Sequence, residues 1–233
     1  MKDPALRLVV TGGTGALGSA VVRRLLEQGH RVAVPYRGAE GWKALRAGAG
    51  PGTSTGLWGD AADISDLDAA RGFMDAAARE MGGIDGVAAL AGGYAGSGPL
   101  ETTPATEWDD MLRINLSSAH ATCRAAIPHL LRDGGSVVTV VSRSAEAGGA
   151  GAAAYATAKM GVLALTRALA LENRDRGIRF NAISPAIIDT AANRAAMPKA
   201  DRSRWTRPEA IALVVAWLLS PASAPVTGAV IPV

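Results

Sequence analysis

The sequence predicts an α/β fold, a doubly wound parallel sheet of about seven strands with helices on both faces. Short apolar runs rich in β-branched residues alternate with longer alanine- and leucine-rich stretches of helical length. The short runs are apolar throughout, which is typical of parallel strands buried on both faces. The length of 233 residues fits a single domain over 1–233, and no linker or internal repeat divides it.

Each short apolar run is expected to form a strand, because it has strand length and is bounded by turn residues. In chain order the runs are 6–11, 31–35, 55–58, 86–91, 136–142, 178–183 and 228–233, of which 55–58 is the weakest. The predicted helices between them are 16–27, 66–81, 105–131, 152–175 and 208–219. Ser65 and Thr206 stand before two of these helices as N-terminal signals.

Two segments have neither the strand pattern nor the helix pattern. Residues 38–54 are rich in glycine and alanine, and residues 186–204 mix small and charged side chains before the last helix. We interpret 186–206 as a segment that covers a substrate pocket, and the alternative interpretation is a mobile connection.

The composition excludes several classes of protein. Apolar residues make up 48% of the chain and charged residues 19%, which is too apolar for a disordered chain. The net charge is only +3 and the basic residues are scattered, so no nucleic-acid partner is expected. Cys123 is the single cysteine and the histidines are dispersed, so we expect neither a disulfide nor a metal site. From Met1 to Pro4 the chain enters the first strand without a leader or membrane segment, which predicts a cytoplasmic protein.

A glycine-rich loop follows the first predicted strand and opens the first helix. It runs from Thr11 to Gly18 as Thr-Gly-Gly-Thr-Gly-Ala-Leu-Gly. Glycines let the backbone approach a pyrophosphate, and a helix N-terminus offers free N–H groups and a positive dipole end. Its place inside a strand–helix–strand unit favours a dinucleotide site over a purely structural turn. The residues expected to bind the dinucleotide here are Gly12, Thr14, Gly15, Ala16, Leu17 and Gly18.

The second predicted strand leads into Tyr36 and Arg37, where such folds contact the adenosine ribose. An acidic residue that would bind the ribose hydroxyls of NAD is absent there. Arg37 is expected to pair with the 2′-phosphate of NADP or to stack on adenine, so NADP(H) is favoured and NAD(H) is the alternative. Asp63 and Ile64, after the third strand, are expected to bracket the adenine. A solvated Arg37 and a merely turn-forming Asp63 are the structural alternatives.

Tyr155 and Lys159 stand four residues apart in the predicted helix 152–175, so their side chains share one face. An adjacent cation stabilises a phenolate, which brings the pKa of the phenol closer to neutral and suits it to acid–base chemistry. Ser142 ends the preceding strand, where its hydroxyl would hold a substrate carbonyl beside Tyr155. Each residue alone is common in structural roles, and their combination is what indicates a catalytic site.

Together these motifs resemble the short-chain dehydrogenase/reductase family of Rossmann-like, NAD(P)-dependent oxidoreductases. The matching elements keep the family's order along nearly the whole chain. They are the glycine loop, Asp63, Ala91-Gly92, Asn115, Ser142, Tyr155, Lys159, 181–185 and 189–190. The resemblance implies hydride transfer between nicotinamide and a ketone or secondary alcohol as the small-molecule substrate. It also implies a homodimer or homotetramer that pairs through helices 105–131 and 152–175.

The resemblance assigns roles to individual residues. Tyr155 would be the general acid/base, and Lys159 would bind the nicotinamide ribose and depress the pKa of Tyr155. Ser142 would position the reacting oxygen, and Asn115 would support a proton-relay water. The further residues that it places along the cofactor are Ala91, Gly92, Pro185, Ile188 and Thr190.

Local features are also similar to the dihydropteridine reductase branch of the family. They are the glycine loop, Tyr94 after Gly92-Gly93, the stretch 189–201 and Trp205-Thr206. That branch reduces a C=N bond in a pterin, and Tyr94 would stack on the substrate ring. Ser142 argues against this alternative because members of the branch typically lack the serine. A non-catalytic NAD(P)-sensing regulator is a third interpretation, and the intact Tyr155–Lys159 pair argues against it.

Overall fold

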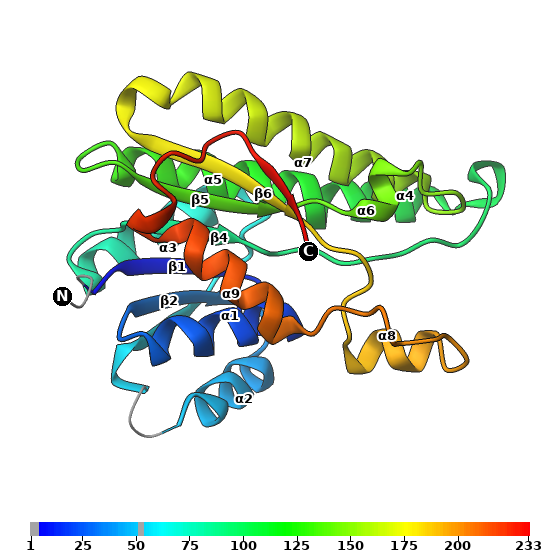
Figure 1. The fold of residues 1–233 in the computed structure, drawn as a ribbon, viewed down its shortest axis with the longest axis horizontal. Helices are drawn as coiled ribbons and strands as arrows, with labels where there is room; N and C mark the ends of the chain where they lie inside the picture. Colours follow the sequence, from blue (N-terminus) through cyan, green and yellow to red (C-terminus); the bar gives the residue numbers. More distant parts are fainter. Residues whose placement is uncertain (1–4, 51–53) are drawn as a thin grey trace.

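A seven-stranded parallel sheet forms the centre of the protein, in a computed structural model that describes residues 5–50 and 54–233 (Figure 1). The strand order is β3-β2-β1-β4-β5-β6-β7. The strands are β1 (Arg7–Thr11), β2 (Arg31–Tyr36), β3 (Leu57–Ala61), β4 (Gly86–Ala89), β5 (Gly135–Val140), β6 (Ile178–Ser184) and β7 (Val230–Pro232). Each of the seven predicted strands is confirmed, whereas the expectation for Met1 to Pro4 lies outside the described residues.

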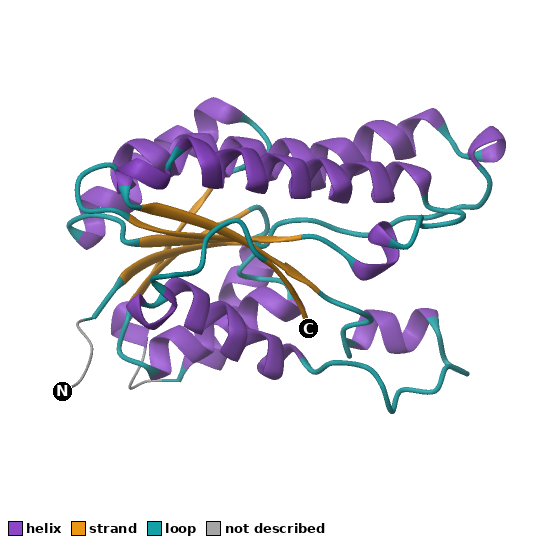
Figure 2. Ribbon diagram, turned by 45° about the horizontal axis from the view of Figure 1, so that its top comes forward, coloured by secondary structure: helices purple, strands orange, loops and turns teal. Residues whose placement is uncertain are grey.

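Helices cover both faces of the sheet, as Figure 2 shows. They are α1 (Ala16–Glu27), α2 (Ala39–Ala49), α3 (Leu67–Met81), α4 (Ala105–Met111), α5 (Ser118–Leu130), α6 (Arg143–Glu146), α7 (Ala153–Glu172), α8 (Ala191–Ala196) and α9 (Pro208–Leu219). A π-helical segment, Leu112–Ser117, joins α4 to α5. Short 3₁₀ turns occupy Ser54–Gly56, Leu100–Thr102, Arg174–Arg176 and Pro221–Ser223.

Two apolar cores lie on the two faces of the sheet. On one face, α3 and α5 bury Phe73 and Leu130 against Phe180 of β6. On the other face, α1 and α9 bury Leu25 and Ile211. These five side chains are at most 4% exposed, and burying each contributes roughly 1.5–3 kcal/mol. The helices therefore hold the sheet from both sides and leave its carboxyl edge free for a site.

The strand order reverses at β1, which lies between β2 and β4. Ligands bind at such a switch point in doubly wound sheets. Pairing of β2 with β1 covers only Arg31 to Ala33, whereas its pairing with β3 continues to Tyr36. The end of β2, including Pro35, therefore does not pair with β1. Pro35 lines the cavity that opens between the two strands.

The prediction that 38–54 is irregular is wrong for 39–49, which form α2, whereas 51–53 lie outside the described residues. Its glycines obscured an apolar stripe in which Leu45 is buried and Trp42 packs against the core shared with α1. Trp42 also stacks on Tyr36, with ring centroids 5.1 Å apart. Packing of these side chains overrides the low helix propensity of glycine.

The single helix predicted over 105–131 is divided by the π-helical segment. Such segments insert one extra residue into a helical turn and often occur at functional sites. Asn115 lies in this segment and bonds to the backbone of Gly93. The helical periodicity of the sequence over 105–131 does not indicate this insertion.

Three boundary predictions also need correction. The N-cap residue of α3 is Asp66 and not Ser65, because the Asp66 side chain accepts a hydrogen bond from the backbone N of Ala69 at 2.8 Å. Arg207 and not Thr206 is the N-cap residue of α9, since Thr206 pairs with the strand-like backbone of Ile188. Segment 186–204 is not irregular throughout, because it contains α8.

Candidate functional site

A cavity of about 390 Å³ lies at the carboxyl edge of the sheet, bounded by the loops after β1, β2, β3 and β4. Ligand pockets typically fall between about 300 and 1,000 Å³. The cavity brings together most of the residues predicted to bind a cofactor. Those that line it are Gly12, Thr14, Gly15, Ala16, Leu17, Gly18, Arg37, Asp63, Ile64, Ala91, Gly92, Tyr155, Lys159 and Ile188.

The glycine loop leaves no room for side chains at Gly12 and Gly18. Gly12 has a φ of +70°, and a Cβ on it would lie 2.8 Å from the backbone N of Ala91. A Cβ on Gly18 would overlap the carbonyl oxygen of Gly12. Gly15 is the N-cap residue of α1 and supplies no capping side chain, so the first N–H groups of the helix are free to bind an anion. The loop therefore fits the pyrophosphate of a dinucleotide.

The end of β2 and the turn before α3 line the part of the cavity where adenosine is expected. Tyr36 and Arg37 both line it, and the stacked ring of Trp42 holds Tyr36 in place. The carboxylate of Asp63 accepts hydrogen bonds from the backbone N and the Oγ of Ser65 at 3.1 and 2.7 Å. These bonds, and then the nearby charge of Arg37, hold the pKa of Asp63 below its ordinary value. Asp63 thus forms a turn and also faces the cavity.

Tyr155 and Lys159 enter the same cavity from α7. The Nζ of Lys159 lies 5.8 Å from the centroid of the Tyr155 ring and donates a hydrogen bond to the Val140 carbonyl at 3.1 Å. Lys159 is 6% exposed, and burial lowers the pKa of its ammonium to about 8. Burial also raises the pKa of Tyr155, by more than the Ser142 hydroxyl lowers it. The expected net fall of the Tyr155 pKa toward neutral is therefore not met, because burial dominates.

Ser142 lies two residues beyond the end of β5 and is the N-cap residue of α6. Its hydroxyl lies 2.8 Å from the hydroxyl of Ser144 and lowers the pKa of Tyr155. The short helix α6 is tied to β6 by a 2.8 Å hydrogen bond from the Ser184 hydroxyl to the Glu146 carboxylate. The backbone around Ser142 is therefore fixed at both ends, although Ser142 itself does not line the cofactor cavity.

Asn115 is buried, and both the nitrogen and the oxygen of its side-chain amide form hydrogen bonds with the backbone. Its Nδ2 donates to the carbonyl oxygens of Gly93 and Met111 at 3.0 and 3.1 Å, and its Oδ1 accepts from the Gly93 N at 3.2 Å. A Cβ on Gly92 would lie 2.5 Å from this Oδ1 and 3.3 Å from the Nζ of Lys159. Asn115 therefore holds the loop after β4 close to Lys159.

The remaining predicted residues lie outside the cavity. The Pro185 carbonyl accepts a backbone hydrogen bond, and the Thr190 hydroxyl caps α8. Of the residues expected along the nicotinamide, only Ile188 among 185–190 lines the cavity. Tyr94 is 69% exposed and stands edge-on to Tyr155, with ring centroids 5.0 Å apart.

Segment 186–206 projects from the carboxyl edge of the sheet and carries α8 (Figure 1). None of the residues of α8 is buried. Asp189 and Arg194 form a two-bond ion pair at 2.6 and 2.7 Å, and Ile188 pairs with Thr206 at the base of the segment. The segment is held together internally and packs little against the sheet.

The sequence does not indicate a role for several residues that shape the site. Tyr36 stands beside Arg37 at the expected ribose position, but nothing in the sequence shows that it lines the cavity. The Val140 carbonyl accepts a hydrogen bond from Lys159, and the Ser144 hydroxyl bonds to that of Ser142. The backbone conformation brings these groups to the site, and no sequence motif indicates it.

Within residues 5–50 and 54–233, no three His, Cys, Asp or Glu side chains gather as metal ligands. Over the same residues, no helix combines the length and apolarity needed to cross a membrane. The chemical groups of the candidate site are the phenol of Tyr155, the ammonium of Lys159, hydroxyls, and the guanidinium of Arg37 and carboxylate of Asp63 at its other end.

Comparison with known proteins covers almost the whole chain. Residues 13–233 match the family model described as enoyl-(acyl carrier protein) reductase. The D-threitol dehydrogenase of Mycolicibacterium smegmatis is 32% identical over 231 residues, which cover 95% of this chain and 88% of that protein. The crystal structure of levodione reductase superposes with a TM-score of 0.89 at 30% identity, covering 97% of this chain and 95% of that one.

A structure of a short-chain type dehydrogenase/reductase from Mycobacterium ulcerans superposes with a TM-score of 0.91 at 25% identity, covering 99% of this chain and 90% of that one. The match of sequence and fold over nearly the full length agrees with the dinucleotide cavity and the Tyr155–Lys159 pair. The chain belongs to the short-chain dehydrogenase/reductase family of NAD(P)-dependent oxidoreductases.

Proposed function

We propose that this protein transfers hydride between a nicotinamide cofactor and a ketone or secondary alcohol, with Tyr155 as the general acid/base. The observation that supports this proposal most directly is that the cavity shaped for a dinucleotide also contains Tyr155, with the Nζ of Lys159 5.8 Å from the centroid of its ring. One relative is named as a dehydrogenase and another as a reductase, which supports both directions of the reaction.

In the direction of reduction, the phenol of Tyr155 donates a proton to the carbonyl oxygen of the substrate. The bound cofactor supplies the hydride that reaches the carbonyl carbon. The Ser142 hydroxyl orients the same carbonyl oxygen beside Tyr155. Lys159 stabilises the phenolate that remains and binds the nicotinamide ribose, and its bond to the Val140 carbonyl fixes the ammonium in place.

The proposal is tested by following the loss of reduced-cofactor absorbance with a panel of ketones. Turnover of at least one ketone is expected. Cofactor binding without turnover of any ketone, but with turnover of a quinonoid dihydropterin, would overturn the assignment of the substrate class. Binding without turnover of either would support a sensor.

We infer that NADP(H) is preferred, because Arg37 lines the cavity at the end of β2 and no carboxylate precedes it. Arg37→Ala is expected to weaken NADPH binding at least about tenfold, the loss of one good charge-assisted hydrogen bond. NADH affinity should change by less than about threefold, since it lacks the 2′-phosphate. Tryptophan fluorescence is a suitable readout because Trp42 stacks on Tyr36 at the cavity wall.

Arg46→Ala is the matched control for this titration. Arg46 lies 6.0 Å from the Trp42 ring but does not line the cavity, so neither affinity should change much. Equal weakening of NADPH and NADH by Arg37→Ala would instead indicate stacking on adenine. No effect on either would make Arg37 a solvated loop residue.

The site and the relatives favour a ketone or secondary alcohol over a pterin. Ser142 stands close enough to Tyr155 to lower its pKa, which suits a carbonyl or alcohol substrate, and the relatives named above are a dehydrogenase and a reductase whose names mention no pterin. Tyr94 and segment 186–206 remain proposed parts of the substrate pocket. Tyr94 would contact the substrate beside Tyr155, and segment 186–206 would close over it as one unit.

We also propose a homodimer or homotetramer that pairs through α4, α5 and α7. Apolar side chains on these helices remain exposed, with Leu171 at 70% and Trp108 and Met160 at 37% and 39%. Size-exclusion chromatography with light scattering is expected to give twice or four times the mass of 23.7 kDa. A single monomeric species at micromolar concentration would contradict this proposal.

A further inference from the structure

A second cavity, of about 300 Å³, lies between α1 and α9 and shares no lining residue with the first. Its lining combines apolar side chains with charged ones. The apolar lining residues are Ala20, Ala210, Ala212 and Leu213, and the charged ones are Arg23, Arg24, Glu27, Arg207 and Glu209. The cavity therefore has an apolar lining for a small organic group and charges that would select its ionic part.

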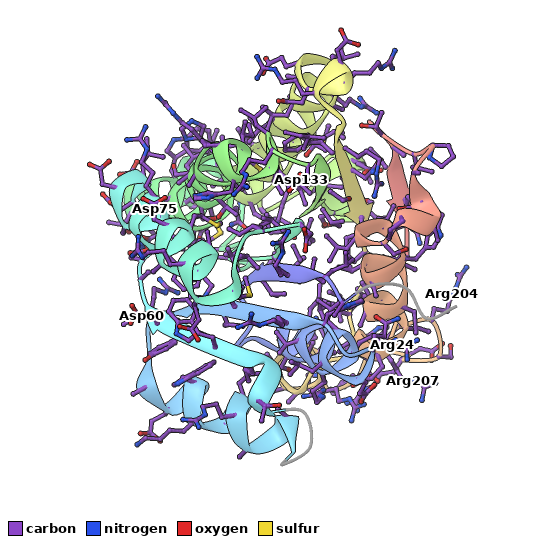
Figure 3. The ribbon with its side chains drawn as sticks, turned by 90° about the vertical axis from the view of Figure 1, so that its left-hand side faces the viewer. Arg24, Asp60, Asp75, Asp133, Arg204 and Arg207 are labelled. Atoms are coloured by element: carbon purple, nitrogen blue, oxygen red, sulfur yellow. The ribbon has the colours of Figure 1, made fainter. Side chains whose placement is uncertain are left out.

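The charges of this cavity are not balanced within the protein. Three guanidinium groups and two carboxylates line it, which leaves a net positive charge. Arg23 forms an ion pair with Glu209, and at 3.7 Å this is a loose one. In the part of the chain that the structure describes, neither Arg24 nor Arg207 forms an ion pair. Figure 3 shows both on the α1 and α9 side of the molecule.

The Nε of Arg24 is buried and has no hydrogen-bond acceptor among the described residues. Buried donors are almost always paired in folded proteins, and leaving one unpaired is destabilising. Arg24 lies in the last turn of α1. Solvent does not reach its Nε, so a ligand in the cavity would contact other atoms of Arg24.

Arg207 is held in place by the backbone on both sides of it. Just before it, the backbone N–H of Thr206 donates to the Ile187 carbonyl at 3.0 Å, and the Thr206 carbonyl accepts from the Asp189 N–H at 2.9 Å. Just after it, α9 begins, and the Arg207 carbonyl accepts a bond from Ala210 at 3.0 Å. A preorganised backbone lowers the entropy lost on binding.

We propose that this cavity binds a phosphate group, either free or as part of a small phosphate monoester. Guanidinium groups bind phosphate oxygens in bidentate, charge-assisted pairs. Three guanidinium groups offer more donors than the two oxygens of a carboxylate can accept, whereas phosphate has enough oxygens for all three. The apolar lining would contact the organic part of a monoester.

Isothermal titration calorimetry tests the site on enzyme saturated with nicotinamide cofactor, so that the glycine loop is already occupied. Inorganic phosphate and glycerol 3-phosphate are titrated at constant ionic strength. Each is expected to bind the wild type saturably. The double variant Arg24→Gln/Arg207→Gln should weaken binding at least about tenfold, the loss of one charge-assisted bond or more. Tighter binding of glycerol 3-phosphate would assign the site to a monoester, and equal binding to free phosphate.

The matched control is Arg79→Gln/Arg132→Gln, which removes two exposed arginines, at the end of α3 and just beyond α5, and the same total charge. It should leave phosphate affinity unchanged. Absence of saturable binding to the wild type, or equal weakening in both double variants, would overturn the proposal. If the Arg24→Gln change prevents folding, the exposed Arg207→Gln alone must still weaken binding, and an unchanged affinity in that variant would equally refute the site.

Discussion

Replacement of Tyr155 by phenylalanine is expected to lower kcat by about 10²–10⁴-fold, the usual contribution of a positioned general acid or base. The ring can remain edge-on to Tyr94, and only the hydroxyl of Tyr155 is lost. Cofactor affinity should change by less than about threefold, because the glycine loop binds the dinucleotide independently. Steady-state kinetics and a fluorescence titration of the same variant separate the two effects.

Thr157→Ala is the matched control for the tyrosine variant. Thr157 is exposed and lies two residues further along α7, so it faces away from the cavity. Its replacement should leave kcat close to that of the wild type. A Tyr155→Phe variant with wild-type kcat would remove Tyr155 from the proposed acid/base role, whereas parallel loss of cofactor binding would indicate a distorted cavity.

Replacement of Lys159 by methionine is expected to make the protein more stable and much less active. The Lys159 ammonium is buried, and its pKa falls from 10.5 to about 8, which corresponds to about 3 kcal/mol of destabilisation at neutral pH. Losing the bond to the Val140 carbonyl costs about 1 kcal/mol, so a net gain of about 2 kcal/mol in the free energy of unfolding remains. Without the cation beside Tyr155, kcat should fall at least about 100-fold.

The stability difference between the wild type and Lys159→Met is expected to depend on pH. Because the pKa of Lys159 is lower in the folded protein, the unfolded chain binds more protons between pH 8 and 10.5. The free energy of unfolding of the wild type should therefore rise across this window and approach that of Lys159→Met. Denaturant unfolding from pH 7 to 10.5 measures this convergence.

Lys43→Met serves as the reference for the lysine variant. Lys43 is exposed and pairs with Glu40 at 2.7 Å, so its loss should change stability by less than about 0.5 kcal/mol at any pH. A Lys159→Met protein less stable than the wild type at pH 7 would show that the ammonium contributes more through its contacts than burial costs.

Much of the fold follows from the sequence because strands buried on both faces leave a strong pattern. The bounds of α1 and α9 agree with the prediction at every residue, since Gly15 and Pro208 mark their starts. The glycine loop and the Tyr155–Lys159 pair were likewise predictable, because their spacing reflects the backbone geometry that brings them to one cavity.

The parts that could not be predicted depend on contacts between distant residues. The helix α2 is held by packing of Leu45 and Trp42 on other elements, including the stack of Trp42 on Tyr36 of β2. The π-helical turn at Asn115 depends on its bonds to Gly93, 22 residues away. The direction of the Tyr155 pKa depends on burial, which no local pattern shows.

Pro35 sits near the end of an interior strand, where a proline is normally excluded because it lacks the N–H of the ladder. Here β1 no longer pairs with β2, so no hydrogen bond to that strand is lost. Because Pro35 has no N–H, it cannot donate a hydrogen bond that would extend the ladder between β1 and β2 through this position. The proline therefore favours the separation of the two strands at the edge where the cavity opens.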